Sequence, residues 1–140
     1  MSVGLLIITH APFGSAAVEA VFGTLGELPL TTRVLDMERD ADMALTQEQA
    51  QALLNEVDQG DGVLILTDLY GATPSNIATQ LLADDKPRQL ITGLNLAMLI
   101  RIMNYPDLGL MELAQKAVNG AHSSIFAHPP LAQHQELDHA

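Results

Sequence analysis

The sequence predicts an α/β fold with an open, mainly parallel central sheet covered by helices on both faces. Short apolar runs alternate along the 140 residues with longer stretches of helical periodicity, which is typical of parallel sheets. Residues 3–9 and 62–67 are almost continuously apolar, as expected for strands covered on both faces. We therefore expect these two strands at the centre of the sheet, and the weaker, more polar runs at 32–35 and 89–92 further out.

Local signals place helices between these strands. Thr46 and Gln49 are spaced as in a capping box, in which two side chains satisfy N–H groups of the first turn. Thr73 followed by Pro74 predicts a cap and a first helical residue, and Asn95 is expected to cap the next helix. The predicted helices cover residues 15–25, 46–57, 74–82, 96–103 and 110–118.

The end of the chain carries weaker signals. Gly120 is predicted to stop the last helix, because glycine is common just beyond a helix end. Residues 121–127 are compatible with a short final strand, and the mostly polar residues 128–140 are expected to be a flexible tail. The length suits a single domain, which we assign to residues 1–127.

Composition and charge limit the function. The formal net charge of −11 disfavours binding to nucleic acid or to an anionic membrane surface. The absence of cysteine excludes a disulfide scaffold, thiolate metal sites and a cysteine nucleophile. The apolar run at residues 3–8 is too short for a signal sequence or a membrane span, so we expect a cytoplasmic protein that does not insert into the membrane.

Two strand ends carry chemically useful side chains. His10 follows the first apolar strand and Asp68 follows the third strand, and in parallel sheets these ends share the edge where ligands bind. If the strands are adjacent, the carboxylate can accept a hydrogen bond from one ring nitrogen and leave the other free to attack phosphorus. Gly71 would allow a tight turn, and Thr73 and the helix that starts near Pro74 could hold the resulting phosphoryl group.

Each of these residues could also have a purely structural role. A single histidine or aspartate at a strand end is more often a loop or capping residue, and it is the pair on two central strands that favours a function. The remaining histidines are His122, His128, His134 and His139. Their spacing does not match structural zinc sites, so no metal or other cofactor is expected. A metal-dependent hydrolase with His10 and Asp68 as ligands stays an alternative, although no further ligand is evident at the other strand ends.

The segments at these strand ends are similar to those of a known family. Residues 4–10 read GLLIITH, residues 67–76 read TDLYGATPSN and residues 93–99 read GLNLAML. Together with the length and strand order, they resemble the IIA component of the mannose-family phosphoenolpyruvate-dependent sugar phosphotransferase system along nearly the whole chain.

The resemblance implies a phosphohistidine carrier. In that family the histidine that ends the first strand accepts a phosphoryl group from the phosphocarrier HPr and passes it to a IIB protein, so His10 would be the acceptor and Asp68 would orient it. A homodimer that exchanges a C-terminal strand, here residues 121–127, is also implied. Because the chain stops at Ala140, without the linker that joins IIB in some members, we expect a separate IIB protein. The expected phosphate-binding residues are Thr9, Gly71, Ala72, Thr73 and Asn76.

Two further alternatives use the same site. The phosphotransfer subunit of the dihydroxyacetone kinase system shares the fold and the histidine placement, although residues 71–76 favour the mannose type. A regulatory binding module would select different partners in its phosphorylated and free forms, without feeding sugar transport.

Overall fold

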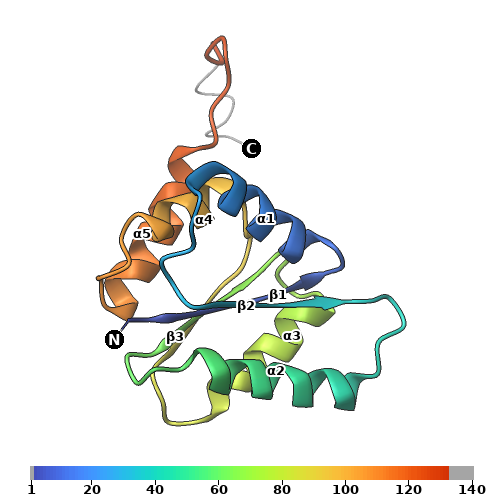
Figure 1. Ribbon diagram of the computed structural model, residues 1–140. Coiled ribbons are helices and arrows are strands. Elements are labelled where there is room, and N and C mark those ends of the chain that lie inside the picture. Colours follow the sequence, from blue (N-terminus) through green and yellow to red (C-terminus); the bar gives the residue numbers. More distant parts are fainter. Residues whose placement is uncertain (1, 133–140) are drawn as a thin grey trace.

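The sheet consists of four parallel strands in the computed structural model, which describes residues 2–132 (Figure 1). The strands are β1 Gly4–His10, β2 Thr32–Met37, β3 Val63–Thr67 and β4 Arg88–Ile91. Their order is β2-β1-β3-β4, and every residue of β1 and β3 except His10 is buried. The prediction that these two strands are central is confirmed.

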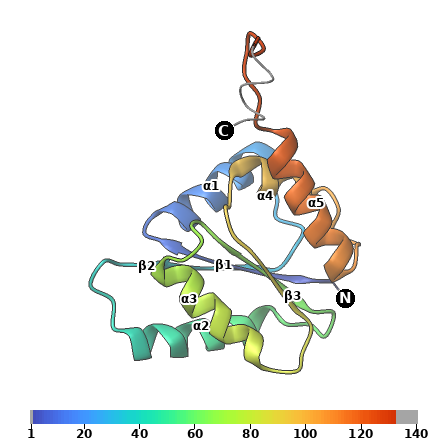
Figure 2. The same ribbon diagram turned by 180° about the vertical axis from the view of Figure 1, so that it is seen from behind.

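Helices cover both faces of the sheet, which confirms the predicted fold class. The helices are α1 Phe13–Leu25, α2 Met43–Val57, α3 Thr73–Gln80, the short 3-10 helix η1 Leu81–Ala83, α4 Leu96–Met103 and α5 Leu110–Ser123. Figures 1 and 2 show α1, α4 and α5 on one face and α2 and α3 on the other. Each crossover between parallel strands therefore contributes to a covering layer.

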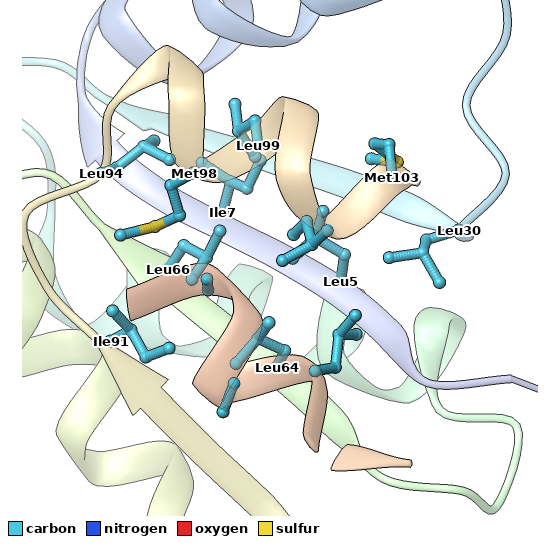
Figure 3. Close-up of a cluster of buried hydrophobic side chains, with 14 of the residues drawn as sticks. Leu5, Ile7, Leu30, Leu64, Leu66, Ile91, Leu94, Met98, Leu99 and Met103 are labelled. Carbon is cyan, nitrogen blue, oxygen red and sulfur yellow. The ribbon is translucent and has the colours of Figure 1, made fainter. Parts of the chain in front are cut away.

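The core has one apolar layer on each face of the sheet, because side chains alternate along the strands. Leu5 and Ile7 of β1 and Leu66 of β3 point toward the layer that contains α4 and α5 (Figure 3). Leu6 and Ile65, their neighbours along the strands, pack in the opposite layer with α2 and α3. This burial on two sides explains the continuous apolar runs and gives the strand ends a rigid support.

The helix starts match the predictions in part. Asn95 caps α4 as predicted, since its Oδ1 accepts the Met98 N–H at 2.8 Å. The predicted capping box at Thr46 is wrong, because α2 begins earlier, where Asp42 Oδ1 accepts the Leu45 N–H at 3.0 Å. Thr46 is instead a buried residue of the first turn, and its hydroxyl donates to the Asp42 carbonyl.

The helix after β3 carries Pro74 in its first turn, as predicted. Its cap position is Ala72 rather than the predicted Thr73, and no side chain bonds to the orphan N–H groups there. The α-helix ends at Gln80 and continues as the tighter η1. Thr73 is therefore exposed at the edge of the sheet and is not used as a cap.

The C-terminal part differs most from the prediction. Gly120 lies inside α5 and does not stop it. Glycine allows α5 to pack against α4 here, because a Cβ atom at this position would come within 2.8 Å of the Arg101 Cβ. The predicted strand at 121–127 is also wrong within this chain, since residues 121–123 complete α5 and the described residues beyond it form no strand. Residues 125–132 extend away from the body of the molecule (Figures 1 and 2), and the rest of the predicted tail lies outside the described residues.

Candidate functional site

His10 and Asp68 meet at the carboxyl edge of the sheet, as predicted. His10 is the last residue of β1, and Asp68 directly follows the neighbouring strand β3. Asp68 Oδ2 lies 2.8 Å from His10 Nδ1 and also accepts the backbone N–H of His10 at 3.0 Å. Since a carboxylate only accepts, Nδ1 carries the proton and Nε2 keeps its lone pair. The His10 side chain is 52% exposed, so the ring is accessible.

Asp68 is kept ionised by its contacts with His10. Burial raises the pKa of its carboxyl group, whose side chain is only 14% exposed. The hydrogen bonds from the ring and the backbone N–H of His10 outweigh this effect, so the pKa of Asp68 lies below its ordinary value. At neutral pH the carboxylate therefore holds the His10 ring in one tautomer and one orientation.

Thr9, the residue before His10, supports the end of β1 from within the core. Thr9 is fully buried, and its hydroxyl accepts the Gly14 N–H at 2.7 Å and donates to the His10 carbonyl at 2.9 Å. On the neighbouring strand, Asp36 accepts the Ser15 N–H at 3.2 Å. The start of α1 is thus joined to the ends of β1 and β2, and Thr9, a predicted phosphate-binding residue, contacts the site through the backbone of His10.

The loop between β3 and α3 is held by a small hydrogen-bond network. Gly71 has a φ of 83°, a left-handed conformation that favours glycine, in agreement with the turn predicted there. Its N–H donates to the Ser75 hydroxyl at 2.9 Å, and this hydroxyl donates to the Ala72 carbonyl at 2.9 Å. The buried Ser75 therefore fixes the loop against the start of α3.

A pocket of about 450 Å³ opens beside the His10 ring. Thr73 and Pro74, at the start of α3, line this pocket together with His10. Asn76 lines a neighbouring groove of about 550 Å³ between α2 and α3, and Thr73 borders both hollows. The structure thus brings His10, Asp68 and Thr73 to one site and places Asn76 at its border. The first turn of α3 presents N–H groups and the positive end of the helix dipole there, which favours an anion.

Three residues that shape the site were missed by sequence reasoning. A Cβ atom on Gly14 would come within 2.9 Å of the Thr9 Oγ1, so glycine allows α1 to start close against β1. A serine in the first turn of a helix is common, so residues 67–76 do not single out Ser75. Asp36 could have been predicted to lie near the site from its position near the end of β2, where it is the register partner of Thr9.

Residues 2–132 contain neither a candidate metal cluster nor a membrane-spanning helix. No group of three or more histidine, aspartate or glutamate side chains in this part of the chain could hold a metal ion. None of the described helices is long and apolar enough to cross a bilayer. His134 and His139 lie outside the described residues.

Proteins with similar sequences include IIA components for several sugars. The chain is 27% identical over 112 residues to the PTS system fructose-specific EIIA component of Bacillus subtilis (strain 168), which covers 79% of this chain and 76% of that protein. It is 28% identical over 110 residues to the sorbose-specific EIIA component of Lacticaseibacillus casei, 78% of each chain. The mannose-specific EIIAB component of Escherichia coli (strain K12) is 26% identical over 129 residues, which are 91% of this chain and 40% of that longer protein.

Solved structures show the same architecture. The mannose/sorbose specific IIA subunit from Enterococcus faecalis superimposes with a TM-score of 0.81 at 26% identity, covering 91% of this chain and 95% of that chain. The PTS IIA protein associated with the fucose utilization operon of Streptococcus pneumoniae gives a TM-score of 0.74 at 26% identity, covering 92% and 97%. The fold that carries the His10 site is therefore that of IIA proteins.

A family model described as "PTS system fructose IIA component" (EIIA-man) matches residues 4–118, which include the whole site described above. A match over this much of the chain shows the family, and with it a phosphotransfer role in a sugar phosphotransferase system. The chain therefore belongs to the EIIA-man family, the mannose-type IIA components of sugar phosphotransferase systems.

Proposed function

We propose that the protein is a phosphohistidine carrier that takes a phosphoryl group from phospho-HPr onto His10 and passes it to a separate IIB protein. The observation that carries the proposal is the 2.8 Å hydrogen bond between His10 Nδ1 and Asp68 Oδ2. This bond places the proton on Nδ1 and makes Nε2 the nucleophile. The exposed ring is open to a protein partner.

The transfer needs no proton to leave His10. In the first step the Nε2 lone pair attacks phosphorus, and the bond between phosphorus and the donor atom of HPr breaks, its electron pair leaving on that atom. The ring, still protonated on Nδ1, becomes a cation that the Asp68 carboxylate stabilises. In the second step a nucleophile of the IIB protein attacks the same phosphorus, and the bond from phosphorus to Nε2 breaks to return neutral His10.

The loop before α3 supports the phosphoryl group in this proposal. Thr73 lines the pocket beside His10 and could offer its hydroxyl, and the backbone at Gly71 and Ala72 leads into the positive end of the helix dipole. Asn76 would act at the border of the site. Positioning and charge stabilisation of this kind are the main requirements for phosphoryl transfer.

Exposed apolar side chains around the site support docking of partner proteins. Phe13 begins α1, Leu69 and Tyr70 follow Asp68, and Met43 lines the pocket. Tyr70 is 84% exposed, which is unusual for a large aromatic side chain that has no partner to contact. Such side chains supply the contact area of a protein interface, and here they would guide a phosphorylated partner toward Nε2.

The proposal is tested by phosphorylation with phosphoenolpyruvate, enzyme I and HPr, read as intact mass under nonacidic conditions. The wild type should gain one acid-labile phosphate, and His10→Ala should gain none. His122→Ala is the matched control, because it removes an exposed histidine at the end of α5 and should gain one phosphate. Full phosphorylation of His10→Ala would exclude His10 as the acceptor, and an unmodified wild type would favour a binding or regulatory role.

A further inference from the structure

Arg39 lines the pocket that opens beside His10, and the transfer from HPr to IIB assigns it no role. It belongs to the turn between β2 and α2, residues 38–41. The Ala11 N–H, just after β1, donates to the Met37 carbonyl at the end of β2 at 3.0 Å, so the two loops that follow these strands lie together. As a result Arg39 and His10 line the same pocket of about 450 Å³.

Arg39 is exposed and lines the pocket, so its guanidinium can reach an anion there. The other charged side chain that lines the pocket is Glu38, and Asp68, which contacts the ring from the β3 side, is engaged with His10. Among residues 2–132, no carboxylate lies within ion-pair distance of Arg39. Arginine suits phosphate because its planar fork can donate two parallel hydrogen bonds.

Three other cationic side chains are engaged elsewhere in the molecule, and Lys86 and Arg101 do not line the pocket. The contacts are Arg33 with Glu56, Arg88 with Asp58 and Asp84, and Lys116 over the ring of Tyr105. A phosphoryl group on His10 would add negative charge to a chain whose formal net charge is already −11, and the resulting repulsion opposes phosphorylation. A local positive charge in the pocket would offset it.

We infer that Arg39 is a positioning residue that binds the phosphoryl group carried on His10 and stabilises its doubly ionised form. This inference rests on one part of the proposed function, namely that His10 is the phosphorylated residue. The charge comes from the same chain as the phosphohistidine, so it acts before a IIB protein arrives and after HPr has left.

The experiment loads the full chain with phosphoramidate, so that no partner protein is needed. His10 Nε2 attacks phosphorus, the P–N bond of phosphoramidate breaks, and ammonia leaves. The phosphohistidine is followed by ³¹P NMR during a pH titration, and its resonance is identified as the one that His10→Ala lacks. In Arg39→Gln the acid dissociation constant of the phosphoryl group should fall roughly three- to tenfold, and Arg39→Lys should recover part of the loss.

Arg33→Gln is the matched control for charge. It removes the same charge from strand β2, but Arg33 does not line the pocket and pairs with Glu56 at 3.0 Å. The phosphohistidine resonance of Arg33→Gln should therefore titrate as in the wild type. Identical titrations of Arg39→Gln and Arg33→Gln would overturn the inference. A wild type that takes no phosphate from phospho-HPr would overturn the donor in the proposed function, whereas the titration would still decide the role of Arg39.

Discussion

At the scale of single residues, one carboxylate oxygen fixes both the position of the His10 backbone and the orientation of its ring. Asp68 Oδ2 accepts the backbone N–H and Nδ1–H of the same residue. The position of the strand end and the orientation of the ring are therefore coupled. An amide in place of this carboxylate would lose the charge, and its NH₂ group could donate to Nδ1 and favour the opposite tautomer.

Asp68→Asn should therefore leave the protein folded but slow its phosphorylation by about tenfold or more. The physical reason is that Nε2 would carry the proton in part of the molecules and would not be nucleophilic there. The measurement is the single-turnover rate of phosphate gain from phospho-HPr by intact mass. Asp61→Asn, the same change at an exposed residue before β3, should keep the wild-type rate. Equal rates for Asp68→Asn and the wild type would contradict the orienting role.

At the scale of elements, α1 starts in direct contact with the ends of β1 and β2. The Gly14 N–H donates to the Thr9 hydroxyl at 2.7 Å, and a Cβ atom on Gly14 would come within 2.9 Å of both the Thr9 Oγ1 and the Val34 Cγ1. Gly23, in the same helix, has open space where a Cβ would lie. The two glycines therefore have opposite effects on stability.

Gly14→Ala should lower the free energy of unfolding by about 1–3 kcal/mol, because the helix start must shift away from the strands. Gly23→Ala should raise it by about 0.5–1 kcal/mol, since alanine has the higher helix propensity. Urea unfolding of both variants provides the comparison. A stabilised Gly14→Ala would show that the close approach of α1 to β1 is not required.

A second contact between elements lies at the opposite edge of the sheet. Arg88 at the start of β4, whose side chain is 2% exposed, pairs with Asp58 at 3.1 Å and with Asp84 at 3.3 Å. The Gly60 N–H donates to Asp58 at 2.9 Å. This hydrogen bond lowers the pKa of the Asp58 carboxyl group, whereas burial raises it. Because the Arg88 charge also lowers the pKa, the pKa lies below its ordinary value.

Because its pKa is lowered on folding, Asp58 stabilises the protein above its unfolded pKa of about 3.9, and this contribution is lost as the pH falls through the lower folded pKa. Asp58→Asn should lower the free energy of unfolding by about 1–2 kcal/mol at pH 7, and the difference should shrink below about pH 4. Urea unfolding from pH 7 to pH 3 measures it, with Asp61→Asn as the control. A difference that does not depend on pH would exclude the charge of Asp58 as its cause.

At the scale of the whole molecule, the described C-terminal residues leave an apolar surface uncovered. Ile125 and Phe126 are 75% and 80% exposed, and the segment that contains them extends from the body of the molecule (Figure 1). Burial of such side chains against a second subunit would stabilise an assembly. This surface supports the predicted homodimer, although the segment is not a strand in the single chain.

We predict that the wild type sediments with twice the mass of one chain and that a double substitution, Ile125→Asp with Phe126→Asp, sediments as a monomer. The introduced charges would have to be buried in the dimer at a large cost. Tyr70→Asp, a charge at an exposed aromatic next to the His10 site, should remain dimeric. A double variant that stays dimeric would place the interface elsewhere.

Several features were predictable because they depend on short stretches of chain. Residues buried on both faces of a sheet must be apolar, so β1 and β3 were recognisable as central strands. Asn95 was recognisable as a cap because its hydrogen bond to Met98 is local. His10 and Asp68 follow the two central strands, and parallel strands place such ends at one edge.

Other features depend on contacts between distant segments, which no local pattern records. Gly120 is an example, because a glycine at a helix end and a glycine at a helix crossing look alike until Arg101 is placed against it. Thr46 is a different case, because it has the residue type and spacing of a cap but a second local candidate, Asp42, lies one turn earlier and caps the helix. Arg39 carries no local signal, since only the pairing of β1 with β2 brings its loop to His10.

By itself, the sequence determined the α/β class, the two central strands and the histidine and carboxylate at their ends, because apolar periodicity and strand direction are properties of the chain. Only the tertiary structure decided which ring nitrogen of His10 is free, which residues hold the loop before α3, and which cation shares the pocket. These depend on distances of about 3 Å between atoms from different elements, and packing of the complete fold sets such distances.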